Sequence, residues 1–261
     1  MKVAILITGQ LRDYKVNCLN HIKQIIEPNE ADVFVYACNK NTLHSTGPNI
    51  TQKYNITTVY KKDKIIEELK EVYGSYLKNV VVNEDEELSD DGFGTLGYFK
   101  KRMNNQMTNI RQGFLMSKEY SETNDFSYDV IVRCRPDNSA FDRPVDLSGV
   151  EIKDDIVYTT IYPSGHRDPW FFSFSTPSTF DKYCSFVYMD GEDEARTDNN
   201  FDCPEISLEK YIKSNGMDLV YIRSVCLPFY GIDKTKITDF PYRNINEKLI
   251  DADGNLVEQR I

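Results

Sequence analysis

Two arginines and an aspartate close the most strand-like run of the chain, at Arg133, Arg135 and Asp137. The run before them, Tyr128 to Cys134, is almost continuously apolar, and alternation along a strand places the three charged side chains on one face. A guanidinium neutralises phosphate well, and a carboxylate is a hard oxygen ligand suited to Mg²⁺ or Mn²⁺. The pattern predicts a site for a diphosphate and a divalent cation. The alternative is a buried Arg–Asp pair that ties down a loop.

A second polar segment follows the first apolar run, Lys2 to Thr8. Ligands of open α/β sheets bind at the carboxyl ends of strands, which makes this turn a candidate site. Glycine lets a backbone approach a ligand closely, and the polar side chains around it can reach a base, a ribose or a phosphate. The residues concerned are Thr8, Gly9, Gln10 and Arg12. A plain strand-to-helix turn is the alternative. Neither G-x-G-x-x-G nor G-x-x-x-x-G-K-[ST] occurs, which argues against a dinucleotide fingerprint and a P-loop ATPase.

Two carboxylates are candidates for a general base. Asp168 lies beside Trp170, the single tryptophan of the chain, in a segment where aromatic rings could stack on a sugar and an acid could bind its hydroxyls. Glu205 follows Pro204 at the start of a predicted helix, where a carboxylate is held rigidly enough to take a proton. Interaction with the helix dipole explains Glu205 equally well. His166, near Asp168, is interpreted as a hydrogen-bonding loop residue.

The elements that position these residues follow from hydrophobic periodicity. The first three elements form a βαβ unit, which predicts a parallel sheet. They are a strand at Lys2 to Thr8, a helix at Asp13 to Ile26 and a strand at Asp32 to Ala37. Residues 39–56 are interpreted as a loop, and 83–94 as a mobile one. Further strands are predicted at 57–60, 80–82, 128–134, 157–161, 170–175 and 219–225, and further helices at 63–73, 98–120, 176–188 and 205–214. The polar segment 231–261 is expected to wrap the domain irregularly.

Composition sets the class of protein. The chain has 261 residues, 40% of them hydrophobic, and a formal charge of -10. This suits one α/β domain and disfavours nucleic acid or an anionic membrane as a partner. Six cysteines form no C-x-x-C pair, and Cys38 and Cys134 are expected in the core. No stretch predicts a signal peptide or a transmembrane segment, so we expect a cytoplasmic protein.

The order of these motifs resembles a group of glycosyltransferases. The chain resembles surface-glycan glycosyltransferases of bacteria and of large DNA viruses, including those of algae. The resemblance is carried by four segments: the opening Ile5 to Arg12, the run Asp32 to Val35, the central R-x-R-P-D that ends at Asp137, and Pro204-Glu205 before a late helix. The resemblance covers roughly residues 1–225. It implies the GT-A fold, a Rossmann-like α/β architecture with a mixed, mostly parallel central sheet flanked by helices.

The resemblance also implies roles for the residues. A nucleotide-binding half (about 1–138) and an acceptor-binding half (about 139–230) would share one sheet, followed by the wrap 231–261. The GT-A fold typically uses an Asp-x-Asp motif whose last acid holds a metal ion, Mn²⁺ or Mg²⁺, against the diphosphate of a nucleotide-sugar donor. Asp137 takes that role here, but Arg135 stands at the first acidic position, so the motif departs from the pattern.

The expected reaction is transfer of a sugar, from a UDP-sugar first and a GDP-sugar next, to a hydroxyl of a glycan acceptor. Asp168 or Glu205 would be the base if the reaction inverts configuration. Two alternatives remain open: a nucleotidyltransferase, which usually has a Gly- and Lys-rich loop absent here, and a non-catalytic domain that binds glycans or nucleotides.

Overall fold

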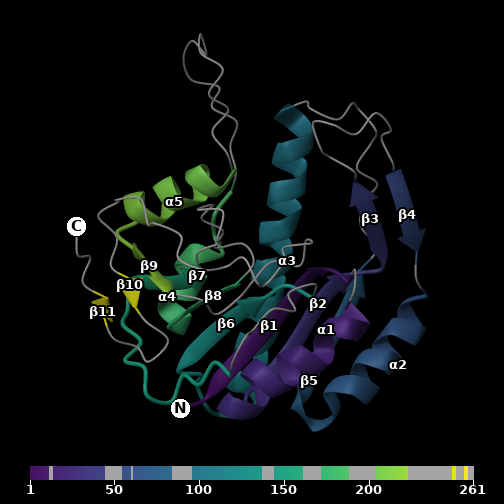
Figure 1. The fold of residues 1–261 in the computed structure, drawn as a ribbon, viewed down its shortest axis with the longest axis horizontal. Coiled ribbons are helices and arrows are strands. Elements are labelled where there is room, and N and C mark those ends of the chain that lie inside the picture. Colours follow the sequence, from purple (N-terminus) through teal and green to yellow (C-terminus); the bar gives the residue numbers. More distant parts are fainter. Residues whose placement is uncertain are drawn as a thin grey trace, which may run out of the picture.

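A nine-stranded sheet runs through the described part of the chain, with helices on both of its faces (Figure 1). The computed structural model describes residues 1–11, 14–44, 55–59, 61–83, 96–136, 144–160, 172–187, 204–222, 249–250 and 256–257. The sheet contains β1 (Val3–Gln10), β2 (Asp32–Cys38), β5 (Leu77–Asn83), β6 (Val130–Cys134), β7 (Ile156–Thr160), β8 (Phe172–Ser175), β9 (Asp218–Ile222), β10 (Leu249–Ile250) and β11 (Leu256–Val257).

The strand order is β11-β10-β9-β7-β8-β6-β1-β2-β5. The pairs β1–β2, β1–β6, β2–β5, β7–β9 and β9–β10 are parallel. β8 is antiparallel to both of its neighbours, and β11 is antiparallel to β10. The predicted α/β class with a mixed, mostly parallel sheet is therefore confirmed. Because β8 is reversed, it begins at the edge where β6 and β7 end.

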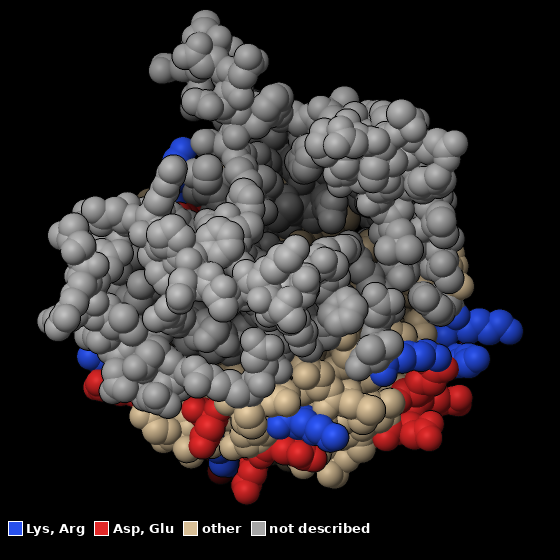
Figure 2. All heavy atoms as spheres, viewed as in Figure 1, with Lys and Arg blue, Asp and Glu red and all other residues tan. Residues whose placement is uncertain are grey.

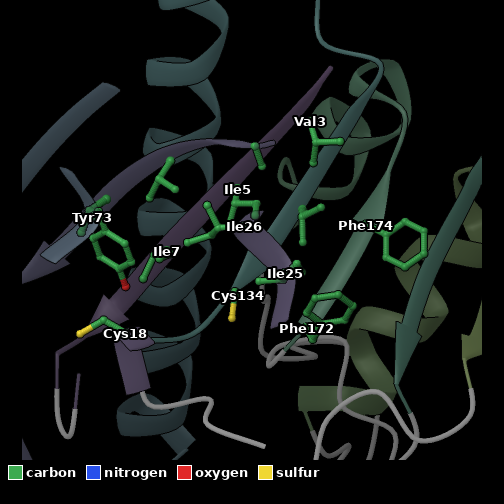
Figure 3. Close-up of a cluster of buried hydrophobic side chains, with 14 of the residues drawn as sticks. Val3, Ile5, Ile7, Cys18, Ile25, Ile26, Tyr73, Cys134, Phe172 and Phe174 are labelled. Carbon is green, nitrogen blue, oxygen red and sulfur yellow. The ribbon is translucent and has the colours of Figure 1, made fainter. Parts of the chain in front are cut away.

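Helices cover the two faces according to the alternation of the strands. Val3, Ile5 and Ile7 of β1 pack with side chains of α1 (Tyr14–His21), the π-helix η1 (Ile22–Ile26) and α2 (Lys62–Tyr73), in the cluster drawn in Figure 3. Ala4 and Leu6 point the other way. They pack in a second cluster with side chains of α3 (Leu96–Thr123), α4 (Pro177–Tyr183) and α5 (Pro204–Ser214). The sheet is thus buried on both faces, as parallel sheets require.

The end of η1 and the turn η2 form an anchor around Pro28. Pro28 lies in the 3₁₀ turn η2 (Glu27–Asn29) and has no N–H to donate. The carbonyl of Gln24 in η1 accepts a hydrogen bond of 2.7 Å from the N–H of Val145. Asn29 adds two more bonds: its Nδ2 donates to the Val145 carbonyl at 2.6 Å, and its Oδ1 accepts from the Leu147 N–H at 2.8 Å. The chain that returns from β6 is therefore tied to η1 and η2.

Several expectations need correction. Residues 39–56, interpreted as a loop, contain β3 (Lys40–His44), which pairs with β4 (Asn55–Val59) in a separate two-stranded antiparallel sheet. The polar composition of this segment hid the strands. The expected irregular wrap, 231–261, contributes β10 and β11 to the sheet, and two-residue strands leave no periodicity to read. The helix that starts at Pro177 ends at Tyr183 rather than at Tyr188.

Charged side chains of both signs lie on the outer surface of α2. The Lys and Glu side chains of α2 are interspersed on the outer surface, where red and blue lie together in Figure 2. Lys61, of the Lys61–Lys62 pair, is exposed.

Of the helices described, none combines the length and the apolar composition needed to cross a bilayer. Cys18, Cys38, Cys134 and Cys184 are buried free thiols, which confirms the core positions expected for Cys38 and Cys134.

α3 approaches β1 closely at a glycine. A Cβ on Gly113 would lie 2.8 Å from Thr8 Cγ2, 3.7 Å from Leu6 Cβ and 3.9 Å from Tyr36 Cβ. The first of these distances is shorter than real Cβ contacts, so a larger residue at position 113 has to push α3 away from the sheet. Gly113 therefore sets the spacing between α3 and the carboxyl-terminal half of β1.

We expect Gly113→Ala to lower the free energy of unfolding by about 1–3 kcal/mol, because overpacking outweighs the helix propensity that alanine adds. Urea unfolding followed by circular dichroism measures the change. Thr8→Ser removes Cγ2, so the double variant should recover part of the loss. Gly149→Ala is the control, since a Cβ there meets nothing within 4 Å. Equal stability of Gly113→Ala and the parent protein would show that the helix moves without cost.

Candidate functional site

The described strands bring the predicted segments to one edge of the sheet. β1, β2, β5, β6, β7 and β9 run in the same direction, so their carboxyl ends lie together, and the reversed β8 starts there (Figure 1). α5 precedes β9 and runs back along it, which places its first residues, Pro204 and Glu205, toward the same end of the sheet. Carboxyl ends of strands are where α/β sheets bind ligands.

The glycine turn and the end of β6 are direct neighbours. β1 and β6 pair with Ile7 beside Cys134, which brings Gly9 level with Pro136 two residues further along. Gly9 has a φ of 121°, a conformation that side chains disfavour, and a Cβ there would lie 4.0 Å from Pro136 Cδ. The predicted meeting of these two segments is thus observed as far as Pro136. Asp137, the next residue in the sequence, lies outside the described residues.

The two arginines of the central segment differ in burial. Arg133 is fully buried, whereas Arg135, the residue after β6, is half-buried. A buried guanidinium is costly unless hydrogen bonds satisfy it, so Arg133 needs its polar neighbours for stability. A ligand can contact Arg133 only by entering the layer between the sheet and α3, while Arg135 stands closer to the edge.

Thr8 and Gln10 share the face of Arg133. Alternate residues of β1 point to α3, and alternate residues of β6 do the same, because Ile131 belongs to the cluster on that side. Thr8 is fully buried and Gln10 is half-buried. Thr8 Oγ1 and Gln10 Oε1 are buried atoms that have no hydrogen-bond partner in the structure. Such atoms are uncommon in folded proteins and mark positions that need an explanation.

Sequence reasoning missed a polar cluster beneath this edge, on the opposite face of the sheet. His21 Nδ1 lies 3.3 Å from the Tyr73 hydroxyl, and Cys134 Sγ lies 3.7 Å from His21 Nε2. Burial raises the pKa of Tyr73 well above its ordinary value, and the nearby Cys18 and Cys134 thiols raise it further. The cluster links α1 and α2 to the end of β6. No spacing in the sequence indicates it, because its members come from three distant elements.

The start of α1 is held by a carboxylate of α2. The Tyr14 N–H donates to the carbonyl of Leu11 at 2.8 Å, which closes the turn after β1. The Tyr14 hydroxyl donates to Glu68, and Lys15 Nζ lies 2.9 Å from Glu68 Oε1. The hydrogen bonds from Tyr14 and Lys15 lower the pKa of Glu68. These contacts fix the chain immediately after the predicted site residues of β1.

The other predicted site residues have partial or no description. Arg12 and Asp168 lie outside the described residues, and for Glu205 only the helical backbone is described. β8 begins at Phe172, beside Cys134, so the chain that carries Asp168 returns to the sheet at this edge. Within the described ranges, no group of three or more His, Cys, Asp or Glu side chains could hold a metal ion. The predicted metal ligand Asp137 was not part of that set.

A cavity of about 280 Å³ opens at the opposite end of the sheet, between α3 and the start of α4. Phe114, Tyr128 and Ile131 are among the residues that line it. Ser117 Oγ donates to the Phe114 carbonyl at 2.7 Å, and Ser121 Oγ donates to the Lys118 carbonyl at 2.9 Å. Its buried hydroxyls are therefore bonded within the protein, in contrast to Thr8 at the carboxyl edge. None of the predicted site residues lines this cavity.

A scan of the chain against protein-family models finds no match, and a search of curated proteins finds none either. Inference about function therefore depends on the sequence motifs and on the geometry described above.

We expect Glu68→Gln to lower the free energy of unfolding at neutral pH. This loss of stability should become smaller as the pH falls into the acid range. Because the folded protein holds the pKa of Glu68 below its ordinary 4.5, its contribution is complete above pH 4.5 and is lost as the pH falls through the lowered pKa. Urea unfolding across pH 3 to 7 measures the difference between variant and parent. The exposed neighbour Glu67→Gln is the control. A difference that stays constant down to pH 3 would contradict the assignment.

Proposed function

We propose that the protein is a glycosyltransferase of the GT-A type. It transfers a sugar from a nucleotide-sugar, with a UDP-sugar as the first candidate donor, to a hydroxyl of a glycan acceptor. One observation carries the proposal: Gly9, in a left-handed conformation, lies beside Pro136 at the carboxyl edge of the sheet. Gly9, which has no side chain, and Pro136, which precedes Asp137 in the sequence, therefore lie together at the end of the sheet where α/β proteins bind nucleotides.

The topology of the sheet supports the same proposal. β5, β2, β1 and β6 form a continuous parallel half, typical of nucleotide-binding α/β domains. β8 then reverses the direction, and β7 and β9 extend the same sheet beyond it. A nucleotide-binding half joined to a second half in one sheet is the arrangement that the resemblance implies for this class of enzyme.

In the proposed complex, the donor nucleotide lies across the turn Thr8 to Arg12 and the end of β2. The Asn39 N–H donates to the Asn83 carbonyl at 2.8 Å, so the backbone beyond β2 is fixed against β5 there. Arg135 offsets the charge that develops on the leaving diphosphate, as preorganised cations do in other transferases. Arg133 supports this field from the interior.

The chemical step exchanges one bond of the anomeric carbon for another. The acceptor oxygen forms a bond to the anomeric carbon, and the bond from that carbon to the diphosphate oxygen breaks with its electron pair. In an inverting reaction Asp168 or Glu205 takes the acceptor proton, and a retaining reaction needs no separate base. Asp137 is the proposed ligand of Mn²⁺ or Mg²⁺, which would supply further positive charge to the diphosphate.

Replacing Asp137 tests the proposal. We expect Asp137→Asn to slow release of sugar from the donor about 10²–10³-fold, the usual cost of removing a group that stabilises transition-state charge. The assay follows free sugar from a panel of UDP- and GDP-sugars, with and without Mn²⁺. Asp125→Asn is the matched control, because Asp125 is an exposed residue after α3 with a φ of 54°, which asparagine tolerates well.

Each result decides between functions. Near-normal turnover of Asp137→Asn would remove Asp137 from the site. Binding of nucleotide-sugars in a thermal-shift assay, without release of sugar, would favour the non-catalytic binding domain. Release of pyrophosphate from a nucleoside triphosphate would favour the nucleotidyltransferase.

A further inference from the structure

A row of polar side chains crosses the α3 face of the sheet near its carboxyl edge. Arg133 of β6 pairs with Ser173 of β8, and Ser173 pairs with Thr159 of β7. All three are at most 1% exposed. Their neighbours along the strands, Val132, Cys134, Phe172 and Phe174, belong to the cluster on the opposite face, so alternation directs Arg133, Ser173 and Thr159 toward α3. Apolar side chains would be expected at these positions.

Thr8 and Gln10 extend this row to β1. Leu6 pairs with Arg133, so Thr8 is a diagonal neighbour of Arg133 on the same face, and Gln10 follows toward the edge. Diagonal neighbours in a sheet lie about 7–8 Å apart, within reach of one ligand. The five side chains Thr8, Gln10, Arg133, Thr159 and Ser173, which we call the polar row, therefore come from four adjacent strands.

Hydrogen bonding divides the polar row into two kinds of residue. The Thr159 hydroxyl donates to the Phe172 carbonyl at 2.8 Å. Ser173 Oγ, Thr8 Oγ1 and Gln10 Oε1 are buried without a hydrogen-bond partner in the structure. A buried polar atom without a partner lowers stability, so the folded chain carries an avoidable cost at three positions of one face. Valine at Thr8 or alanine at Ser173 would remove that cost with almost no change of shape.

We propose that Ser173 and Thr8, with Gln10 and the Arg133 guanidinium, bind the hydroxyl groups of the donor's sugar ring. The inference rests on the proposed function and adds the place of the transferred sugar to it. Gln10 Oε1 only accepts hydrogen bonds and Arg133 only donates them, while the Ser and Thr hydroxyls do both. Phosphate has no donor for Gln10 Oε1, whereas a sugar ring presents hydroxyls that both donate and accept. Thr8, Arg133 and Ser173 are at most 1% exposed, and Gly113 of α3 lies against Thr8, so the ring reaches them only when α3 and the sheet move apart at the carboxyl edge, where half-buried Gln10 stands.

Stability without ligand gives the first test, because the three hydroxyls of the polar row should respond differently. Ser173→Ala and Thr8→Val should unfold at the same temperature as the parent or higher, since they remove an unpartnered polar atom. Thr159→Val is the matched control: it breaks a hydrogen bond in the same row and should lower Tm by about 2–4 °C. A comparable loss in Ser173→Ala and Thr8→Val would show that internal water or protein groups satisfy these hydroxyls, and would overturn the proposal.

Binding gives the second test. The probes are UDP, UDP-glucose, UDP-galactose, GDP and GDP-mannose, titrated by calorimetry against the full chain. In the parent the preferred nucleotide-sugar should bind more tightly than its nucleotide, and Ser173→Ala should reduce that advantage about three- to tenfold, as one lost hydrogen bond does. Affinity for the nucleotide alone should stay unchanged.

The outcomes separate the sugar subsite from the proposed function. If Ser173→Ala keeps the full advantage of the nucleotide-sugar, the subsite is wrong and the glycosyltransferase proposal stands. If the parent binds none of the nucleotides or nucleotide-sugars, the proposed function fails, and the sugar assignment fails with it. If Thr159→Val binds the nucleotide-sugar more tightly than the nucleotide by the same factor as the parent, the result supports the assignment of the sugar to the unpartnered hydroxyls.

Discussion

The parallel pairing of β1 with β6 is the constraint on which the candidate site depends. One register, with Ile7 beside Cys134, decides which residues of two segments more than a hundred positions apart become neighbours. A shift by one residue would turn Thr8 and Arg133 to opposite layers, because side chains alternate along a strand. The register is held from both sides. Apolar residues of β1 enter both hydrophobic clusters, and the His21–Cys134 contact ties β6 to α1.

Buried polar groups lie on both faces of the sheet; some bond with one another, and others, Asn17 of α1 among them, have no hydrogen-bond partner in the structure. Beneath the edge, on the α1 face, His21, Tyr73 and Cys134 bond with one another inside a hydrophobic cluster. On the α3 face, the hydroxyls of Thr8 and Ser173 are buried without such partners. Closed networks of the first kind hold a core in one arrangement. Unpartnered groups of the second kind lower stability in the free protein, which is the usual relation between a binding site and its scaffold.

The sequence predicted the fold well where long elements and strong periodicity met. β1, β2, β6 and α3 fall where apolar runs placed them, since burial on two faces leaves a clear signal. β3 and β4 were missed because short polar strands in a separate sheet bury too little to produce one. The strand-end rule brought Gly9 and Pro136 together correctly, whereas the roles of the candidate site residues stay predictions. Ser173 was hidden because its significance comes from the partner strands, Arg133 on one side and Thr159 on the other, and pairing across strands cannot be read from one sequence.

The proline anchor has a consequence for how this protein can diversify. Residues 137–143 connect two fixed points: Pro136 against Gly9 at one end, and Val145 bonded to Gln24 and Asn29 at the other. Both attachments use backbone groups or residues outside the connecting stretch, so neither depends on the side chains of the seven residues between them. Substitutions at those positions therefore leave the two anchors in place.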